Sequence, residues 1–307
     1  MNKLRIGMLN CHGLKNKFET PEFQNLVSSH EIFGVCETWL NDNESATIPG
    51  FNFYPLNRKK DKEIAKGGTK GGIGVYIKHE YKKHVKVMYD ISTEIVLWCK
   101  ISKSFLNSKD ETYLGITYVP PEYSTREKRL QKDHFTNLTE KLSTLPTNRH
   151  ILIGDFNART SDREDRLMRE KHDDHNPPEL FSHIKKKRCN LDTVENRYGK
   201  LLLELTAATQ SYIANGRTLG DLQGNLTCHE TRGSSTVDYA IVSEALKKEV
   251  KKFKVLPPSV GSDHCPIELE ISYHASKISK EKDNLTPLKP KVIWNEDTIK
   301  IFNYHMN

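Results

Sequence analysis

The sequence predicts an α+β fold in which mainly antiparallel sheets pack together and helices cover them. Short apolar runs bounded by turn residues far outnumber the segments with helical periodicity. Many of these runs also follow one another without a helix between them, as in residues 72–118. Consecutive strands of this kind pair in antiparallel fashion, whereas a purely parallel sheet needs a crossover helix between its strands.

The predicted elements follow from the apolar runs in chain order. The runs LRIGMLN at 4–10 and IFGVCE at 32–37 are apolar almost throughout, as in buried strands, and each ends on a polar residue. Later runs repeat this pattern and predict strands over residues 72–77, 94–101, 113–118, 150–155, 212–215, 237–242 and 266–271. Apolar residues at helical spacing predict helices over residues 18–29, 126–145 and 198–209.

Length and composition indicate a soluble globular protein. With 307 residues the chain can form one large domain or two modest ones, and it can bury a core without a metal or a disulfide. Hydrophobic residues make up 36% of the chain, charged residues 28%, and the mean hydropathy is −0.66. The apolar runs are too short for a membrane span, and the segment MNKLRIGMLNC does not resemble a signal peptide. We therefore expect an intracellular protein with no membrane partner.

Cysteine spacing and net charge narrow the range of partners. The six cysteines form no CxxC pair and most lie in strand-like runs, so buried free thiols are expected and zinc is not. The net charge of +7 and the pI of about 8.9 fit a polyanionic partner better than a small neutral one. Neither a GxxxxGK[ST] nor a GxGxxG motif occurs, which argues against nucleoside triphosphate chemistry and dinucleotide binding.

Two charged segments and the C-terminal region differ from the rest of the chain. Residues 57–71 are basic and glycine-rich, and residues 160–190 are crowded with charge, including KKKR at 185–188. A solvated loop is the simpler interpretation of each, and contact with nucleic-acid phosphates is the alternative. From about Ala275 the composition shifts to Lys, Asn, Thr and Pro. We expect a domain over residues 1–274 and a linker or tail over residues 275–307.

Polar side chains stand at the ends of several predicted strands. Asn10, Glu37 and Tyr118 each close an apolar run, and Asp155 closes another with Asn157 two residues later. Taken singly, such residues are more simply explained as surface or turn residues. Their recurrence at strand ends makes them candidates for a common site.

Two further motifs complete the groups that phosphodiester hydrolysis requires. Asp238 in STVDYAIV can orient His264 in GSDHCPI, and a histidine held by a carboxylate is a common device for activating water. Glu37 suits a hard divalent cation such as magnesium, while the charge on the phosphate needs hydrogen-bond donors. Asn157 and Tyr118 can donate hydrogen bonds to the phosphate. Asp155 can orient or deprotonate the attacking water.

The stretch LIGDFNART at 152–160 admits two interpretations. On an extended backbone, side chains at i and i+2 point the same way, so Asp155 and Asn157 present a carboxylate and an amide to one spot. Phe156 between them then points into the core. The alternative is a capped turn without catalytic meaning. Taken together with Glu37 and His264, we favour the active-site interpretation over the turn.

The six motifs resemble those of a known protein superfamily. In chain order, LNCHGL, VCETWL, GITYVPP, LIGDFNA, STVDYAIVS and GSDHCPI closely resemble the exonuclease–endonuclease–phosphatase superfamily, over about residues 3–272. Within this superfamily, the sequences of the motifs CETWL, GDFNAR and SDHCPI look most like the apurinic-type endonuclease domain of non-LTR (LINE-type) retrotransposons. The resemblance implies a deoxyribonuclease I-like fold, a four-layer α/β sandwich of two mainly antiparallel sheets flanked by helices.

The resemblance also implies roles for the motif residues. Asn10 and Glu37 fall where the family binds its catalytic metal, which implies Mg²⁺ as cofactor, with Mn²⁺ as a possible substitute. The implied catalytic residues are Tyr118 at the scissile phosphate, Asp155 at the water, Asn157 at the phosphate oxygens, Asp238 paired with His264, and Asp263 at the metal or leaving group. Asn215 and Thr227 fall near positions that line the cleft. Among loop residues, Arg217 and Arg232 are candidates for minor-groove contact, with a plain surface arginine as the equally simple alternative.

The chain departs from the abasic-site repair enzymes that resemble it in the same motifs. His12 stands where those enzymes usually carry Asp. Residues 233–237, GSSTV, are small and polar where those enzymes place bulky aromatic residues. A tight pocket for a flipped-out abasic sugar is therefore not expected.

These features together predict a Mg²⁺-dependent endonuclease that nicks one strand of double-stranded DNA and leaves a 3′-hydroxyl. In a LINE-type retrotransposon this hydroxyl primes reverse transcription at the target site, which implies a nuclear role and a downstream reverse transcriptase. The alternatives are an abasic-site DNA repair endonuclease, a small-molecule phosphoesterase of the same fold, and a DNA-binding domain that has lost catalysis.

Overall fold

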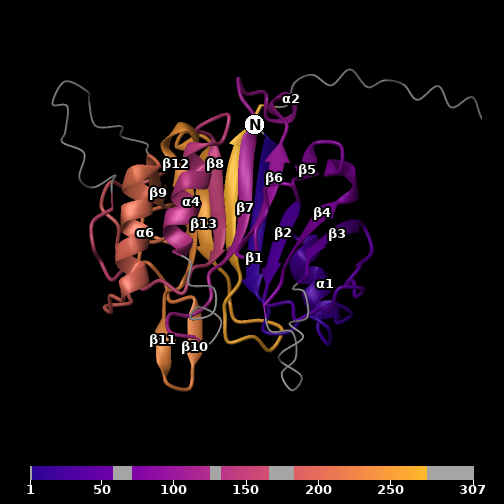
Figure 1. Cartoon of the computed structure of the whole chain (residues 1–307), viewed down its shortest axis with the longest axis horizontal. Coiled ribbons are helices and arrows are strands. Elements are labelled where there is room, and N and C mark those ends of the chain that lie inside the picture. The colour runs from indigo at the N-terminus through magenta and orange to yellow at the C-terminus, as the bar shows by residue number, and fades with distance from the viewer. Residues whose placement is uncertain (1, 58–70, 125–132, 166–182, 275–307) are drawn as a thin grey trace, which may run out of the picture. The chain divides into compact units, whose positions relative to one another are not determined.

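Two six-stranded sheets form the framework of the part of the chain that the computed structural model describes, residues 2–57, 71–124, 133–165 and 183–274 (Figure 1). In the first sheet the strand order is β13-β14-β1-β2-β4-β3. Its strands are β1 (Asn2–Asn10), β2 (Ile32–Cys36), β3 (Phe51–Leu56), β4 (Ile73–Lys78), β13 (Val250–Val255) and β14 (Ile267–Tyr273). All of the described residues belong to one compact unit, Met1–Ser276.

The second sheet has the order β5-β6-β7-β8-β12-β9, and a separate two-stranded hairpin lies beside it. The strands of this sheet are β5 (Val85–Val87), β6 (Val96–Ile101), β7 (Thr112–Tyr118), β8 (His150–Asp155), β9 (Ser211–Ile213) and β12 (Asp238–Ser243). The hairpin consists of β10 (Cys228–Glu230) and β11 (Gly233–Ser235), and it projects at the lower edge in Figure 1.

Three helices cover the outer faces of the sheets, and each begins with a side chain that caps its first turn. Thr20 caps α1 (Pro21–Ser28), Asp133 caps α4 (His134–Ser143) and Asn196 caps α6 (Arg197–Ala208). Shorter helical segments are α2 (Lys103–Leu106), η1 (His79–Tyr81) and η2 (Glu244–Leu246).

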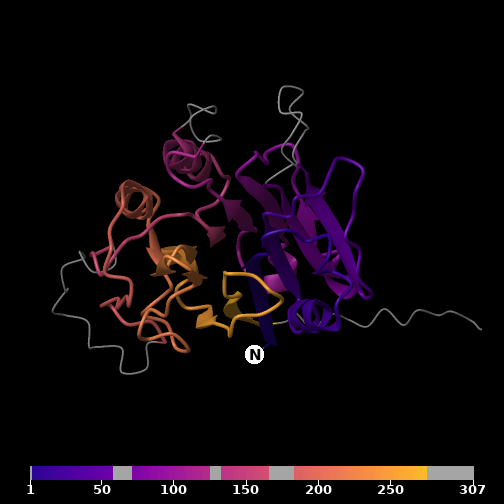
Figure 2. The same ribbon diagram turned by 90° about the horizontal axis from the view of Figure 1, so that it is seen from below.

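The hydrophobic core divides into three clusters that correspond to the spaces between four layers. One cluster lies between the two sheets and includes Met8, Ile116 and Ile153. A second cluster joins the second sheet to α4 and α6, and a third joins the first sheet to α1. Figure 2 shows α1 on one side of the sheets and α4 and α6 on the other. The predicted four-layer α/β sandwich of two mainly antiparallel sheets is confirmed.

Each sheet contains one parallel pair of strands at its centre. In the first sheet β1 runs parallel to β2, with Asn10 beside Cys36, and in the second sheet β7 runs parallel to β8, with Tyr118 beside Asp155. The chain crosses from one strand of each pair to the next through α1 and α4, because parallel neighbours require a crossover connection. β1 and β2 pack against β7 and β8. The two parallel pairs therefore deliver their polar strand ends to adjoining positions of the facing sheets.

The strands and helices predicted from the apolar runs all have counterparts in the structure, with ends that differ by a few residues. The structure also contains elements that the sequence did not predict: β3, β5, β10, β11, β13, α2, η1 and η2. Most of these have only three or four residues, while β3 contains a proline and β13 has three lysines among its six residues at a sheet edge. The N-terminal part of the predicted helix at 126–145, most of both charged segments and the predicted tail at 275–307 lie outside the described residues.

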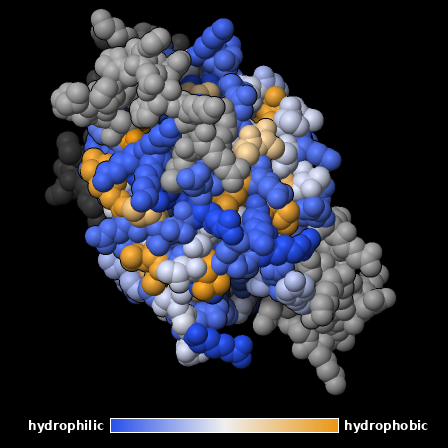
Figure 3. Space-filling view, turned by 90° about the vertical axis from the view of Figure 1, so that its left-hand side faces the viewer, coloured by the Kyte–Doolittle hydropathy of each residue, from blue (hydrophilic) through white to orange (hydrophobic). Residues whose placement is uncertain are grey.

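The surface is polar and the thiols are mostly internal. On the face seen in Figure 3, hydrophobic residues form small separate patches among hydrophilic ones. Five of the six cysteines are buried as predicted, and Cys189 is exposed. Among the described helices, none has both the length and the apolar character that a bilayer crossing requires.

Candidate active site

Asn10 joins the carboxylates at the ends of the two sheets. Its Nδ2 donates to Glu37 Oε1 at 3.1 Å and to Asp155 Oδ2 at 3.0 Å, while its Oδ1 accepts from the backbone N–H of His12 at 3.1 Å. Asn10 is buried, so these partners determine which way the amide faces. The prediction that Asn10 is a metal ligand stays a prediction; in this structure its oxygen accepts from the backbone and its nitrogen faces the acids. Its role is to hold two carboxylates side by side.

Glu37 stands just after β2 and is surrounded by donors. Its Oε1 accepts from the hydroxyl of Tyr118 at 3.0 Å as well as from Asn10, and its Oε2 accepts from Trp39 Nε1 at 3.2 Å. Burial, and then the charge of Glu37, raise the pKa of Tyr118, so the phenol stays protonated and remains a donor. The indole of Trp39 in turn meets the imidazole of His12 edge-on, with ring centroids 4.7 Å apart.

Backbone strain is concentrated at this edge. His12, Glu37, Trp39 and Asn157 all have φ between 43° and 54°, in the left-handed region that residues with a Cβ seldom adopt. Such conformations persist where surrounding contacts enforce them, and they occur preferentially at functional sites. The hydrogen bonds of Asn10, Glu37 and Asp155 supply contacts of this kind here.

The GDFN stretch is both a turn and part of the site. Asn157 is left-handed, its backbone N–H donates to Asp155 Oδ1 at 2.8 Å, and its Nδ2 donates to Asp155 Oδ2 at 3.1 Å and to the carbonyl of Val119 at 2.9 Å. This is an Asx turn, in which an acid caps the backbone two residues on. The expectation that extended backbone aligns the two side chains is therefore wrong, although they do meet. Phe156 is fully buried in the core, as predicted.

Asp155 and Asp238 place two buried carboxylates next to each other. They are directly opposite in the β8–β12 pair, and each is 1% exposed. Burial raises the pKa of Asp155, and the charge of Asp238 raises it further. Two adjoining buried acids of this kind are stabilised by a positive charge between or beside them.

Asp238 and His264 form the predicted pair. Asp238 Oδ2 lies 2.8 Å from His264 Nδ1, and both side chains are buried. Burial by itself lowers the pKa of His264, but the charge and the hydrogen bond of Asp238 outweigh it and raise the pKa overall. Because Nδ1 is engaged by the carboxylate, Nε2 is the nitrogen left for a ligand or substrate.

Three loop residues that the sequence assigned to substrate binding are internal. Thr227 Oγ1 accepts from the backbone N–H of Asp238, and Asn215 Nδ2 donates to the carbonyl of Asp238, so both support the start of β12. Arg217 is 0% exposed and forms an ion pair with Asp165 at 2.8 Å. The assignment of Asn215, Thr227 and Arg217 as substrate contacts stays a prediction; in this structure all three are buried, with at most 1% of the residue exposed. By contrast, Arg232 is exposed in the turn between β10 and β11.

Asp263 lies at the rim of the site. Its Oδ1 is 3.3 Å from His12 Nδ1, and its side chain is 28% exposed. Burial opposes ionisation of Asp263, but His264 and His12 together lower its pKa. Ser262, which sequence reasoning did not single out, donates from Oγ to the carbonyl of Asn10 and so ties this segment to β1. Trp39 was also missed, although both residues stand inside the recognised motifs.

A divalent cation fits the acids that the structure brings together. The ligand atoms of Asp155, Asp238 and His264 lie within 4.8 Å of one another. Carboxylate oxygens are the donors that hard cations such as Mg²⁺ prefer, and a cation offsets the repulsion between the two buried acids. This group consists of residues predicted to be catalytic, whereas Glu37, the predicted ligand, lies on the other side of the Asn10 bridge.

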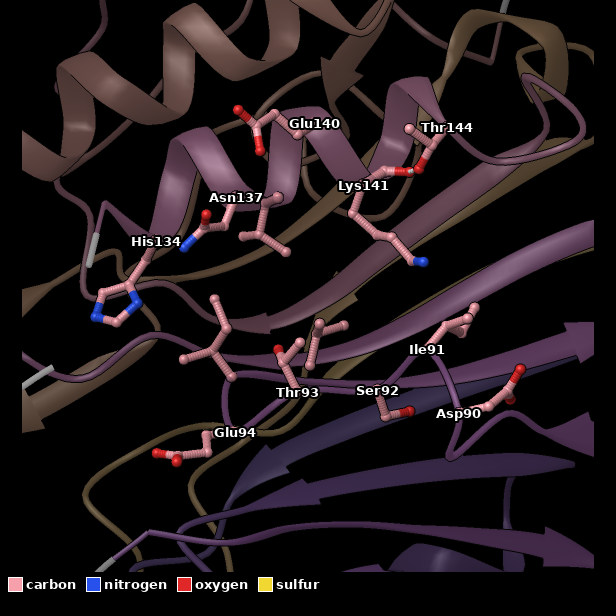
Figure 4. A pocket seen from close by; sticks show the side chains of 13 residues that line it. Asp90, Ile91, Ser92, Thr93, Glu94, His134, Asn137, Glu140, Lys141 and Thr144 are labelled. Atoms are coloured by element: carbon pink, nitrogen blue, oxygen red, sulfur yellow. Dashed lines mark hydrogen bonds between the residues drawn. The ribbon is translucent and has the colours of Figure 1, made fainter.

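The cavity shown in Figure 4 lies elsewhere. It has a volume of about 590 Å³ and lies between α4 and residues 90–96, with Glu94, His134 and Lys141 among its lining residues. None of the predicted site residues lines it. The candidate active site is therefore identified by its polar contacts and its strained backbone and not by the size of a cavity.

Comparison with known proteins agrees with this geometry. The endonuclease/exonuclease/phosphatase family matches residues 9–264, which include every candidate site residue from Asn10 to His264. The chain belongs to this family. Membership supports a metal-dependent hydrolase of phosphate esters, and leaves the substrate open. No curated protein matches the chain.

Solved structures of the family share the fold at low sequence identity. The AP endonuclease LMAP from Leishmania major has a TM-score of 0.64 at 17% identity, over 89% of this chain and 88% of its own. The endonuclease domain of TRAS1, a telomere-specific non-LTR retrotransposon, has a TM-score of 0.55 at 15% identity, over 89% and 99%. The 3′-5′ exonuclease NExo from Neisseria meningitidis has a TM-score of 0.58 at 14% identity, over 88% and 100%. At these identities the likeness establishes the fold alone.

Proposed function

We propose that this chain is a Mg²⁺-dependent endonuclease that nicks one strand of intact double-stranded DNA and leaves a 3′-hydroxyl. The proposal rests on one observation: polar side chains at the ends of four strands lie next to a carboxylate–histidine pair. Asn10, Glu37, Tyr118 and Asp155 are joined by hydrogen bonds, and Asp155 adjoins Asp238. Phosphodiester hydrolysis needs groups of these types in one place.

The protein groups divide the work according to their protonation and partners. His264, held by Asp238, presents Nε2 to the phosphate, and its raised pKa makes it a charged donor there. Asp155 keeps a raised pKa, which suits a group that takes a proton from water. Tyr118 remains a neutral donor. Asn157 has both amide hydrogens engaged by Asp155 and Val119, so its primary effect is to orient Asp155.

Magnesium, when bound, supplies positive charge to the phosphate oxygens and the leaving group. We propose Glu37 as its ligand, and the amide of Asn10 holds this carboxylate next to Asp155, which remains the base for water. Mn²⁺, which also prefers oxygen ligands, is expected to substitute for it.

The hairpin β10–β11 supports a DNA substrate. Its base is fixed beside His264, since Cys228 forms a β-bridge with His264 and the N–H of His229 donates to the carbonyl of Asp263. Residues 229–235 are mostly exposed and include Arg232 in the turn. β11 carries only Gly and Ser, so it offers no aromatic wall for an abasic sugar. This favours intact duplex over the repair substrate.

In the wider setting, we propose that the 3′-hydroxyl primes reverse transcription in the nucleus by a reverse transcriptase of the same retrotransposon polyprotein. The similarity of fold to the TRAS1 endonuclease domain is in line with this proposal. The net charge of +7 suits a DNA-binding protein.

A plasmid assay tests the function. Supercoiled plasmid is incubated with the protein with and without Mg²⁺, next to an oligonucleotide duplex that bears one abasic site. We expect Mg²⁺-dependent nicking of the plasmid, a nick that a polymerase can extend, and loss of both in His264→Ala. Cleavage confined to the abasic site would support the repair alternative. No cleavage of either DNA, with turnover of inositol phosphates, would support a small-molecule phosphoesterase.

A further inference from the structure

A second group of metal ligands lies beside His264 on the hairpin side. The ligand atoms of Cys228, Asp263 and His264 lie within 4.8 Å of one another. Cys228 begins β10, more than thirty residues before the other two, and its backbone is bridged to that of His264. The N–H of Cys265 donates to the carbonyl of Thr227 at 2.7 Å, so the two segments lie side by side on fixed backbone.

The donor set of this group selects a different ion from the oxygen-rich acids of the active site. A thiolate, an imidazole and a carboxylate suit Zn²⁺, whereas Mg²⁺ binds sulfur poorly. Zinc bonds of about 2.0–2.3 Å place tetrahedral ligand atoms about 3.3–3.8 Å apart. Small rotations of side chains that already lie within 4.8 Å of one another reach this spacing.

His264 is already held as zinc-binding histidines usually are. Its Nδ1 is 2.8 Å from Asp238 Oδ2, which leaves Nε2 for the metal. A carboxylate on the far nitrogen of the imidazole is the common outer partner of zinc-bound histidine, since it fixes the tautomer and the ring orientation. Cys228, Asp263 and His264 are thus placed to bind the ion directly, and Asp238 holds the His264 ring in position.

His12 lies next to Asp263 on the exposed side of this group. Its Nδ1 lies 3.3 Å from Asp263 Oδ1, and its side chain is 51% exposed, compared with 28% for Asp263. Cys228 and His264 are buried behind them. An ion from solvent therefore reaches Asp263 and His12 first and the thiol last.

We propose that Cys228, Asp263 and His264, with His12 as the fourth ligand, bind Zn²⁺ and that this ion inhibits the enzyme. On binding, a Zn–S bond and a Zn–N bond form, and the thiol proton of Cys228 and the Nε2 proton of His264 are released to solvent. Inhibition rests on the proposed function, because zinc occupies the Nε2 atom that His264 would otherwise present to the phosphate. The sequence did not indicate this site, since His12 and Cys228 are far in the chain from Asp263 and His264 and form no CxxC motif.

A binding experiment tests the site independently of activity. Zn²⁺ is titrated into the purified full chain by calorimetry, and zinc X-ray absorption tests for a Zn–S bond. We expect one site with a Zn–S contact in the wild type, affinity at least about 10-fold weaker with no Zn–S contact in Cys228→Ser, and weaker affinity in His12→Ala. Circular dichroism checks that Cys228→Ser is folded, and the exposed His12 gives a second variant that leaves the core intact.

Two matched controls separate this site from adventitious binding. His229 follows Cys228 but is exposed on the other face of β10, where it meets Ser234. Cys189 is the exposed thiol among the six. His229→Ala and Cys189→Ser should both keep the wild-type affinity and the Zn–S contact. Equal zinc affinity in the wild type and Cys228→Ser, or loss of the Zn–S contact in Cys189→Ser, would overturn the proposal.

Nicking in Mg²⁺ with added Zn²⁺ tests the inhibition. Each variant's rate is expressed relative to its own rate without zinc, and we expect zinc to inhibit the wild type, His229→Ala and Cys189→Ser but not Cys228→Ser. Zinc bound through sulfur without inhibition would refute the regulatory part. If no variant nicks DNA under any condition, the proposed function fails, and the zinc titration still decides the site.

Discussion

Asn10 illustrates how a single side chain determines the geometry of the candidate active site. A metal-binding asparagine would direct its oxygen to the ion, but the oxygen of Asn10 accepts from His12 and its nitrogen lies between Glu37 and Asp155. The amide thereby keeps two acids close at little electrostatic cost, because it donates to both. The same edge carries several residues with left-handed backbone, so local strain and hydrogen bonding are distributed over one small region.

The Asp238–His264 contact leads to a prediction at the scale of a single residue. Asp238→Asn replaces an acceptor with an amide that can donate to Nδ1, which favours the wrong tautomer of His264. We expect the single-turnover nicking rate to fall by about 100- to 10,000-fold, with DNA affinity little changed. The exposed Asp162→Asn is the control and should keep the wild-type rate. A fall of less than about threefold in Asp238→Asn would show that the pair does not support catalysis.

Glu37 allows the two candidate metal positions to be distinguished. Glu37→Gln keeps the shape of the side chain but replaces a carboxylate with an amide, which is a poorer ligand for Mg²⁺. We expect nicking to fall and the Mg²⁺ concentration for half-maximal rate to rise. If the Mg²⁺ dependence is unchanged, Glu37 is not a ligand, and the cluster of Asp155, Asp238 and His264 becomes the metal site.

At the scale of the elements, the two parallel strand pairs explain why the site forms where it does. β1 and β2 end at Asn10 and Cys36, and β7 and β8 end at Tyr118 and Asp155. Close packing supports these ends: a Cβ on Gly154 would lie 1.9 Å from the carbonyl of Thr117. Replacement of Gly154 by alanine would therefore displace β7 from β8 at the residue before Asp155.

His150, at the start of β8, gives a pH-dependent prediction for this strand. Burial lowers its pKa from 6.5 to about 4, and its Nε2 lies 2.8 Å from Ser211 Oγ. The folded state therefore disfavours the protonated imidazole, while the unfolded state takes up a proton below about pH 6.5. Stability is full above that pH and falls as the pH drops toward 4, by about 3 kcal/mol for this group.

Urea denaturation of the wild type and of His150→Gln checks the expected loss. The variant lacks the titrating group, so the difference in unfolding free energy between pH 7 and pH 4 should be smaller in His150→Gln by most of that amount. His79 is exposed in η1, and His79→Gln serves as the control for the exchange of a histidine for glutamine. Parallel pH profiles for His150→Gln and the wild type would contradict the assignment.

At the scale of the whole molecule, loops far apart in the sequence pack into a layer that supports the start of β12. The ion pair between Asp165 and Arg217 joins residues separated by 52 positions, and Asp165 also accepts from the backbone N–H of Ile213 at 3.1 Å. Thr227 and Asn215 hold Asp238 from the same side. In the proposed function, the hairpin β10–β11 and the rim of the site form the surface that contacts DNA.

Two arginine variants test which residues support the fold and which contact DNA. Arg217→Met leaves Asp165 buried without its partner, so we expect a loss of about 3–5 kcal/mol in unfolding free energy. Arg232→Ala should change stability by less than about 0.5 kcal/mol, weaken DNA binding, and reduce the salt dependence of binding by about one counterion. The measurements are urea denaturation and DNA affinity over a range of salt concentrations. The opposite pattern would restore Arg217 as a DNA contact.

Most of the fold and the main groups of the candidate site were predictable from the sequence. Buried strands leave long apolar runs, and polar residues at their ends are visible as interruptions of those runs, as at Glu37 and Asp155. Strands of three residues, such as β5 and β10, leave no such pattern. The sequence also does not distinguish an exposed arginine from a buried one, and Arg217 and Arg232 therefore looked alike until the loops were placed.

The sequence by itself determined the layered fold, the family and the types of groups at the site, because hydrophobic periodicity and motif order are properties of the linear chain. Only the tertiary structure decided which way Asn10 faces, that GDFN is an Asx turn, and that Cys228 lies beside Asp263 and His264. The physical reason is that hydrogen-bond direction, burial and metal-ligand distance depend on contacts between segments far apart in the chain. Those contacts exist only after the two sheets and their loops have packed.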